Sequence, residues 1–155
     1  MMDIDPRTFP ARPPSEVEWE DLLVRVEIAP RALRIAVEDA PRDAVLVEVL
    51  QLAVGLEAQL QLELRAMVDD TPLPGSGGVP LTEGISTADE HVAEYARWRT
   101  RNFVMLQRRG INVWEWRVRG GLHDGATAYQ LLQAAAARDG TLLATVRGAA
   151  RESRA

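Results

Sequence analysis

Two histidines, His91 and His123, are the side chains of this sequence best suited to acid–base chemistry near neutral pH. His123 is followed directly by Asp124 and lies close to Thr127 and Tyr129, so a His–Asp pair could act as a general base. Adjacent residues in a loop usually point apart, however, and Asp124 is also a suitable N-cap for a following helix. We therefore favour a structural role for this pair and predict no catalytic residue.

His91 has Glu94 three residues later, so both side chains could lie on one face of a helix. Two ligands do not complete a metal site, because zinc sites use three or four protein ligands. The sequence has no cysteine, which excludes thiolate ligands, disulfides and a cysteine nucleophile, and its two histidines exclude a site of three. We expect His91 to lie on the surface, and we expect no metal and no cofactor.

Arginine supplies all 18 basic side chains of the chain, so a lysine Schiff base or a lysine general base is excluded. Arg99 and Arg138 each fall within an apolar stripe of a predicted helix. A buried arginine needs a partner, because breaking a buried ion pair costs about 3–5 kcal/mol. Glu48 and Asp139 are candidate partners for Arg138. For both arginines we favour a structural ion pair over the alternative, a role in binding an anion.

Charge is unevenly distributed along the 155 residues, which carry a net charge of −5. Residues 1–90 are strongly acidic and residues 91–155 are basic, so we expect complementary faces within one molecule or between two copies. The acidic balance and the lack of a dense basic run argue against a nucleic-acid partner. The N-terminus does not resemble a secretory signal, and no apolar stretch approaches the ~18 residues of a membrane span. We expect a cytoplasmic protein with no membrane partner.

Four long stretches with apolar residues at helical spacing would position these side chains. The first begins at Ser15, the second at about Pro41, the third at Thr87 and the fourth at Thr127. Ser15, Thr87 and Thr127 each have a Glu or Gln three residues later, which is the capping-box pattern. Pro30 predicts a kink or a break in the first helix, because proline removes one backbone hydrogen bond.

The remaining segments are predicted to be loops. Residues 71–86 contain several prolines and glycines and read as a flexible crossover. Residues 111–125 alternate weakly, but a lone strand has no partner, so we predict a loop with one helical turn. The sequence thus predicts an all-α four-helix bundle over residues 15–150, with a disordered or extended N-terminus (1–14) and a tail (151–155).

All four helices carry segments that resemble a known family, and the segment from Asp21 to Leu33 in the first is similar to the N-termini of its members. Trp114-Glu115 precedes a glycine-containing loop and the run TAYQLLQAAAARD, from Thr127 to Asp139, which leads into Leu142-Leu143. This pattern resembles the fourth helix of the DinB-like (YfiT-like) superfamily. The run EVLQLAVGLE, from Glu48 to Glu57, is similar to the family's second helix, and Arg99 matches an arginine common in its third.

The resemblance implies an up-down-down-up bundle that is often dimeric. In many members three histidines hold a divalent metal at one end of the bundle, and several such members are thiol-dependent transferases or isomerases. The positions that correspond to the histidines are Leu52, Arg138 and Leu142. Leucine has no lone pair to donate and arginine repels a cation, so a metal site of the family type is absent.

We favour a metal-free DinB-like protein that binds a small ligand in the pocket at Leu52, Arg138 and Leu142, or a partner, without catalysis. We also expect a homodimer. The alternative is a transferase-like enzyme that holds an anionic thiol cofactor with Arg99 and Arg138. A third interpretation is a purely structural protein, one half of a hetero-oligomer built on the acidic and basic faces.

Overall fold

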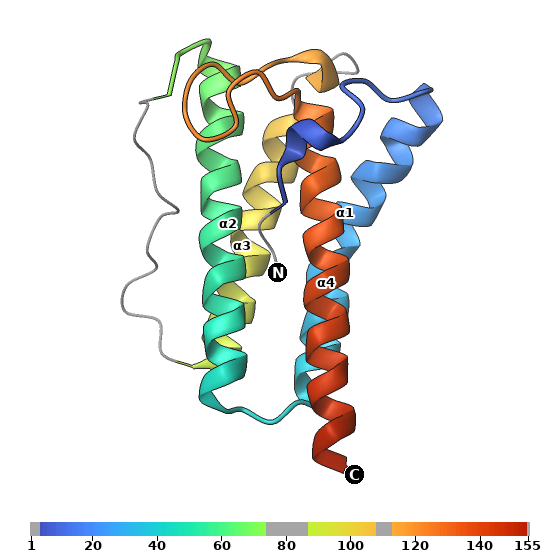
Figure 1. Ribbon diagram of the computed structural model, residues 1–155, viewed down its shortest axis with the longest axis vertical. Helices are drawn as coiled ribbons and strands as arrows, with labels where there is room; N and C mark the ends of the chain where they lie inside the picture. The colour runs from blue at the N-terminus through green and yellow to red at the C-terminus, as the bar shows by residue number, and fades with distance from the viewer. Residues whose placement is uncertain (1–3, 74–86, 108–112, 155) are drawn as a thin grey trace.

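Four helices make up the bundle (Figure 1), as a computed structural model of residues 4–73, 87–107 and 113–154 shows. They are α1 (Glu16–Glu38), α2 (Ala44–Asp69), α3 (Ala88–Gln107) and α4 (Ala128–Arg154). Two short 3₁₀ turns, η1 (Pro6–Thr8) and η2 (Val113–Glu115), precede α1 and α4. The predicted all-α four-helix bundle is confirmed, and η2 is the single turn expected between the third and fourth helices.

The helices follow the up-down-down-up order, because α2 and α3 run in one direction and α1 and α4 run in the other (Figure 1). Around the bundle the neighbours are α1, α3, α2 and α4, with the α2–α4 contact the loosest of the four. Most of the predicted crossover at 71–86 and the end of the third helix near Arg109 lie outside the described residues.

The helix starts are set by side chains that accept the first free backbone N–H groups. Ser15, Thr87 and Thr127 each accept a hydrogen bond from the backbone N–H three residues later, at 3.3, 3.2 and 3.1 Å. At Thr87 and Thr127 the later Glu or Gln side chain also accepts from the cap's own N–H. The capping boxes predicted there are therefore present. α2 begins later than predicted, with Asp43 as its N-cap.

The apolar core consists of two clusters stacked along the bundle axis. The lower cluster, at the end of the bundle where α1 leads into α2 (Figure 1), includes Leu33, Leu50, Val54, Leu142 and Val146. The upper cluster includes Trp19, Leu22, Leu60, Leu132 and the loop residues Val113 and Val118. Between the two lie several buried polar side chains, described below as the candidate site.

α2 is long and apolar enough, by length and composition alone, to cross a membrane. This differs from the prediction that no apolar stretch approaches the length of a membrane span. Half of the apolar window of α2 is buried inside the bundle, and the core helix of a soluble protein meets the same criterion. The composition of α2 is therefore weak evidence for a membrane span.

In the segment 151–155, predicted as a tail, the described residues are helical, because α4 continues to Arg154. Ala150 is buried against the lower cluster, and Arg154 forms an ion pair with Asp39 at 2.9 Å. The positive charges of Arg151 and Arg154 in the last turn also interact favourably with the negative, C-terminal end of the helix dipole. These contacts hold the last turn of α4 in place.

The N-terminal residues 4–14 contain η1 and lie against α4 instead of forming a wholly disordered or extended arm. Gln130 Nε2 donates to the carbonyl oxygen of Phe9 at 2.8 Å, and Thr127 Oγ1 donates to that of Ala11 at 2.7 Å. The two residues of the α4 capping box therefore also hold the N-terminal segment.

The loop before α4 makes one close backbone approach, which yields a prediction. Gly120 has φ +77°, and a Cβ there would lie 2.4 Å from the carbonyl oxygen of Leu73. Gly120→Ala is expected to lower the free energy of unfolding by about 3 kcal/mol, since both the backbone conformation and the contact oppose a side chain. Gly125 has φ +82° with open space around it, so Gly125→Ala should cost only about 1 kcal/mol. Urea denaturation measures both, and equal losses would contradict the prediction.

Candidate functional site

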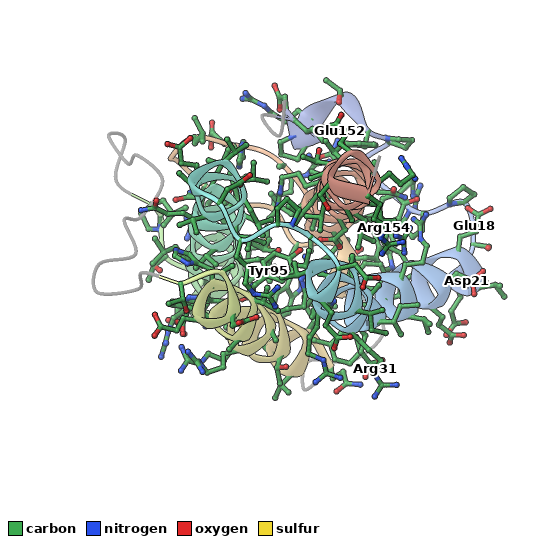
Figure 2. All side chains as sticks on the ribbon, turned by 90° about the horizontal axis from the view of Figure 1, so that it is seen from below. Glu18, Asp21, Arg31, Tyr95, Glu152 and Arg154 are labelled. Atoms are coloured by element: carbon green, nitrogen blue, oxygen red, sulfur yellow. The ribbon has the colours of Figure 1, made fainter. Side chains whose placement is uncertain are left out.

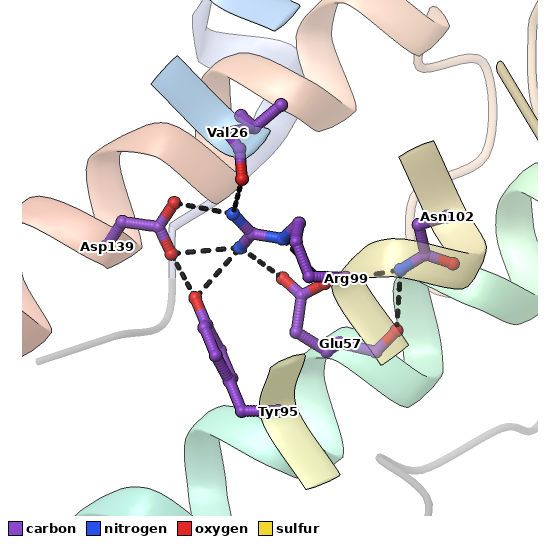
Figure 3. Close-up of polar contacts among 6 residues, drawn as sticks. All are labelled: Val26, Glu57, Tyr95, Arg99, Asn102 and Asp139. Carbon is purple, nitrogen blue, oxygen red and sulfur yellow. Dashed lines mark hydrogen bonds and ion pairs between the residues drawn. The ribbon is translucent and has the colours of Figure 1, made fainter. Parts of the chain in front are cut away.

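A cluster of buried charged and polar side chains occupies the centre of the bundle (Figure 3). Its members are Glu57 on α2, Tyr95, Arg99 and Asn102 on α3, and Asp139 on α4, all at most 6% exposed. We call this set the central cluster. It lies between the two apolar clusters, so each polar group in it must find its partner inside the protein.

Arg99 is the hub of the central cluster. Its Nε and Nη2 donate to the two carboxylate oxygens of Glu57 at 3.0 and 2.6 Å. Its Nη1 and Nη2 donate to the two oxygens of Asp139 at 2.8 and 2.9 Å. Nη2 also donates to the hydroxyl oxygen of Tyr95 at 2.8 Å, and that hydroxyl donates to Asp139. Charge-assisted, bidentate contacts of this kind are roughly twice as strong as hydrogen bonds between neutral groups.

A sixth hydrogen bond of Arg99 explains how α1 accommodates a proline. A proline at position 30 has no N–H to donate to the carbonyl of Val26, one turn earlier. Arg99 Nη1 donates to that carbonyl at 2.7 Å instead. Of the predicted kink or break at Pro30, the break is absent, because α1 runs through this position without interruption, and Figure 1 shows the helix bent as a kink would require. Arg99 replaces the hydrogen bond that the proline removes.

The electrostatics of the central cluster keep the charged groups charged. Burial by itself raises the pKa of Glu57, but the charge and hydrogen bonds of Arg99, with contributions from Arg138 and Asn102, bring that pKa below its ordinary value. Burial opposes the charge of Arg99, yet Glu57, Tyr95 and Asp139 raise the pKa of Arg99 well above its ordinary value. Burial and the neighbouring carboxylates also raise the pKa of Tyr95 well above its usual range, which keeps the hydroxyl protonated.

This geometry favours a structural role for the central cluster over catalysis. Every N–H of Arg99 is donated to a protein oxygen, so none is free for an exogenous anion. The ion pair favoured in the sequence analysis for Arg99 is present, with Glu57 and Asp139 as its partners. Only the Oδ1 of Asn102 lacks a partner within the cluster, among the residues that the structure describes.

The three positions matched to the family's metal ligands are only partly brought together. Arg138 and Leu142 line a pit with Ala53, Leu56, Glu57 and Tyr95, and its volume is about 10 Å³. That is room for one water molecule at most. Leu52 is not part of this lining and is 46% exposed on the outside of α2. The corresponding residue of α2 in the pit is Ala53, one position later.

The lining of this pit does not fit a metal ion. Ala53, Leu56 and Leu142 offer no donor atom, and Arg138 carries a positive charge. The oxygens of the two other lining residues, Glu57 and Tyr95, already accept hydrogen bonds from Arg99. Across residues 4–73, 87–107 and 113–154, no group of three or more His, Asp or Glu side chains is placed to hold a metal. Glu48, a predicted partner of Arg138, is exposed on α2. The carboxylate whose pKa the charge of Arg138 lowers is that of Glu57.

The position of His91 differs from the expectation. His91 was expected on the surface but is completely buried, with Nδ1 2.7 Å from the carbonyl oxygen of Thr87 and Nε2 without a partner in the described structure. It lies one turn before Tyr95 on the buried face of α3. Its neighbour Glu94 pairs with Arg97 instead. The prediction of a surface histidine is therefore wrong.

His123 and Asp124 point apart, as expected for adjacent loop residues. His123 Nδ1 lies 2.8 Å from Glu63 Oε2, and Glu63 is only 2% exposed on α2. Asp124 accepts from the backbone N–H of Gly120 at 2.7 Å, so it shapes the loop and does not cap α4. The cap is Thr127. The His123–Glu63 contact fastens the loop to the upper end of the bundle.

Glu57, Glu63 and Tyr95 are buried polar residues that sequence reasoning did not single out. A usable signal was present, since Tyr95, Arg99 and Asn102 recur at helical spacing on α3 and Glu57 lies one turn after Ala53 on α2.

In comparisons with known proteins, no family model, no curated protein and no solved structure matches this chain.

Proposed function

We propose that this chain is a metal-free bundle protein of the DinB-like kind that binds a small ligand without catalysis. The four-helix order and the sequence resemblance support the family assignment. The pairing of Arg99 inside the bundle supports the absence of catalysis, because the central cluster presents no free donor or nucleophile. We propose a cytoplasmic location and no nucleic-acid partner, on the acidic balance of the chain.

The observation that carries the binding proposal is a groove of about 410 Å³ between α2 and α4 at the lower end of the bundle. Its size lies within the range of small-ligand pockets. Leu46, Val49 and Val146 supply an apolar lining, and Asp43 and Glu152 lie at its edge. The pit at Arg138 and Leu142 lies one turn further along the same two helices. We propose that the groove, rather than the pit, accommodates a ligand with an apolar body and a cationic head.

The transferase-like alternative has less support. It needs Arg99 and Arg138 to hold an anionic thiol cofactor, but Arg99 already donates to Glu57, Asp139, Tyr95 and the carbonyl of Val26. Arg138 lines a pit that has room for one water molecule at most. The buried carboxylates of Glu57 and Asp139 would also repel the anionic cofactor.

The test is isothermal titration of dodecyltrimethylammonium, below its micelle concentration, with dodecyl sulfate as the anionic comparison. We expect the cation to bind with a 1:1 stoichiometry and at least about tenfold more tightly than the anion, because Asp43 and Glu152 favour a positive charge. Val49→Trp should abolish binding by filling the groove.

Leu62→Trp is the matched control, because Leu62 is exposed elsewhere on α2 and does not line the groove. It should leave binding unchanged. Equal loss in both variants, or tighter binding of the anion, would contradict the proposed groove. Stoichiometric zinc or nickel in the purified protein would contradict the metal-free assignment.

A further inference from the structure

The outer face of α1 carries a row of exposed apolar side chains. Val17, Val24, Ile28 and Ile35 are 63%, 53%, 57% and 56% exposed. Their spacing along the helix places all four within about 20° of one line, at about 100° per residue. This line lies opposite the face of α1 that packs into the core. Single exposed apolar residues are normal on protein surfaces, whereas a contiguous apolar row indicates a contact surface.

Two charged residues, Asp21 and Arg31, complete this row. With them the positions follow one another at alternating spacings of four and three residues, from Val17 to Ile35. That is the heptad spacing by which two helices pack side by side. Figure 2 shows Asp21 and Arg31 on the outer side of α1, directed away from the other helices. We call these six residues the α1 seam. Neither charged residue has an ion pair of 4 Å or less within the described structure.

When two copies of the α1 seam are placed antiparallel, each charged residue faces one of opposite charge and each apolar residue faces another apolar residue. Around a twofold axis at Val26, residues equally far before and after this position face each other. Asp21 then faces the partner's Arg31, Val24 faces the partner's Ile28, and Val17 faces the partner's Ile35. Each of these contacts occurs twice, as in any twofold interface.

Charge selects this arrangement over the others. A parallel pairing in register would place Asp21 against Asp21 and Arg31 against Arg31, and like charges at facing positions are unfavourable. Moving an antiparallel pairing by one heptad would place Asp21 or Arg31 against an apolar residue. Only the arrangement centred on Val26 pairs every seam charge with its opposite. Along one edge of the seam, Glu20 also comes close to the partner's Arg34.

We propose that the α1 seam is a homodimer interface, in which a second copy of this chain packs its α1 antiparallel across it. The two helices meet over about 27 Å, from Val17 to Ile35. This inference is independent of the groove between α2 and α4, which lies on other helices. The dimer leaves that groove open on both copies.

The test measures the molar mass of the full chain by analytical ultracentrifugation over a range of concentrations. We expect a dimer for the natural sequence. Asp21→Arg and Arg31→Asp should each raise the dissociation constant at least about tenfold, because each makes like charges face across the axis. The double variant, which exchanges the two charges, should restore the dimer. All the substitutions are at exposed positions, so thermal unfolding should show that each variant folds.

Arg147→Asp on α4 is the matched control, since it makes the same change of charge at an exposed position outside the seam. It should leave the dimer unchanged. The absence of cysteine allows a second measurement by oxidative crosslinking. Glu27→Cys, close to the axis, should form a disulfide with the same position of the partner, and Ile35→Cys should not.

A monomer at all concentrations would overturn the proposal, and so would a dimer that both single variants leave intact. Failure of the double variant to restore the dimer would also overturn it. Efficient crosslinking at Ile35 but not at Glu27 would indicate a parallel pairing and reject the antiparallel one. None of these results depends on whether the groove binds a ligand.

Discussion

Replacing Arg99 with methionine is expected to lower the free energy of unfolding by about 3–5 kcal/mol. The substitution preserves an unbranched side chain of similar length but leaves Glu57 and Asp139 buried together without the guanidinium that binds both. It also removes the donor to the carbonyl of Val26, which Pro30 leaves without its usual hydrogen bond. Urea denaturation at neutral pH measures the loss, which is a large fraction of the stability of an ordinary domain.

Arg97→Met is the matched control, since Arg97 lies on the same helix but is exposed and paired with Glu94 at the surface. An exposed ion pair contributes at most about 1 kcal/mol, so this variant should stay close to the natural stability. Should Arg99→Met be too unstable to study, Arg99→Lys keeps the charge, loses the two bidentate contacts and is expected to fall in between. Equal stability of Arg97→Met and Arg99→Met would show that the central cluster contributes nothing.

Lowering the pH is also expected to have a large effect on the free energy of unfolding, because it protonates Glu57. Arg99 lowers the pKa of Glu57 in the folded protein below the ordinary value of 4.5, despite the opposing effect of burial. Unfolded chains therefore take up this proton at a higher pH than folded ones. The stability that Glu57 contributes is complete above pH 4.5 or so and is lost as the pH falls through the lowered value. We expect the urea midpoint to drop steeply in this acidic range.

Glu57→Gln tests the assignment of this acid transition. At neutral pH the variant should be less stable by about 3 kcal/mol, because it weakens the pairing with Arg99. Its stability should then change less between pH 5 and pH 3 than that of the natural protein. Glu48→Gln, at an exposed position of the same helix, should keep the full acid slope. An unchanged slope in Glu57→Gln would assign the transition to other carboxyl groups.

The sequence predicted the helices well because their signals are local. The N-caps at Ser15, Thr87 and Thr127 fix three of the four helix starts, and each depends only on residues within one turn. The need of Arg99 for a carboxylate partner could also be stated in advance, from its place within an apolar stripe. Which carboxylate it meets could not, because Glu57 lies 42 residues away on another helix and the rotation of that helix decides the pairing.

The errors in the candidate site have a similar origin. α2 is apolar around most of its circumference, so its sequence does not fix which face is buried. Leu52 was matched to the pit, yet Ala53 lies there and Leu52 faces outward. His91 was placed on the surface by its residue type, whereas its spacing from Tyr95 and Arg99 puts it on the buried face of α3. In both cases the position of the residue around its helix, which residue type alone does not reveal, decides whether the side chain is buried.

The bonds of Arg99 bear on how the chain reaches its native state. Its guanidinium, carried by α3, contacts a backbone oxygen of α1, a carboxylate of α2 and a carboxylate of α4. An assembly in which one of those three helices has not yet docked would keep an ion or a carbonyl in an apolar interior without its partner. Such partly assembled forms are less stable than both the native and the unfolded state. The four helices are therefore expected to fold and unfold as one cooperative unit.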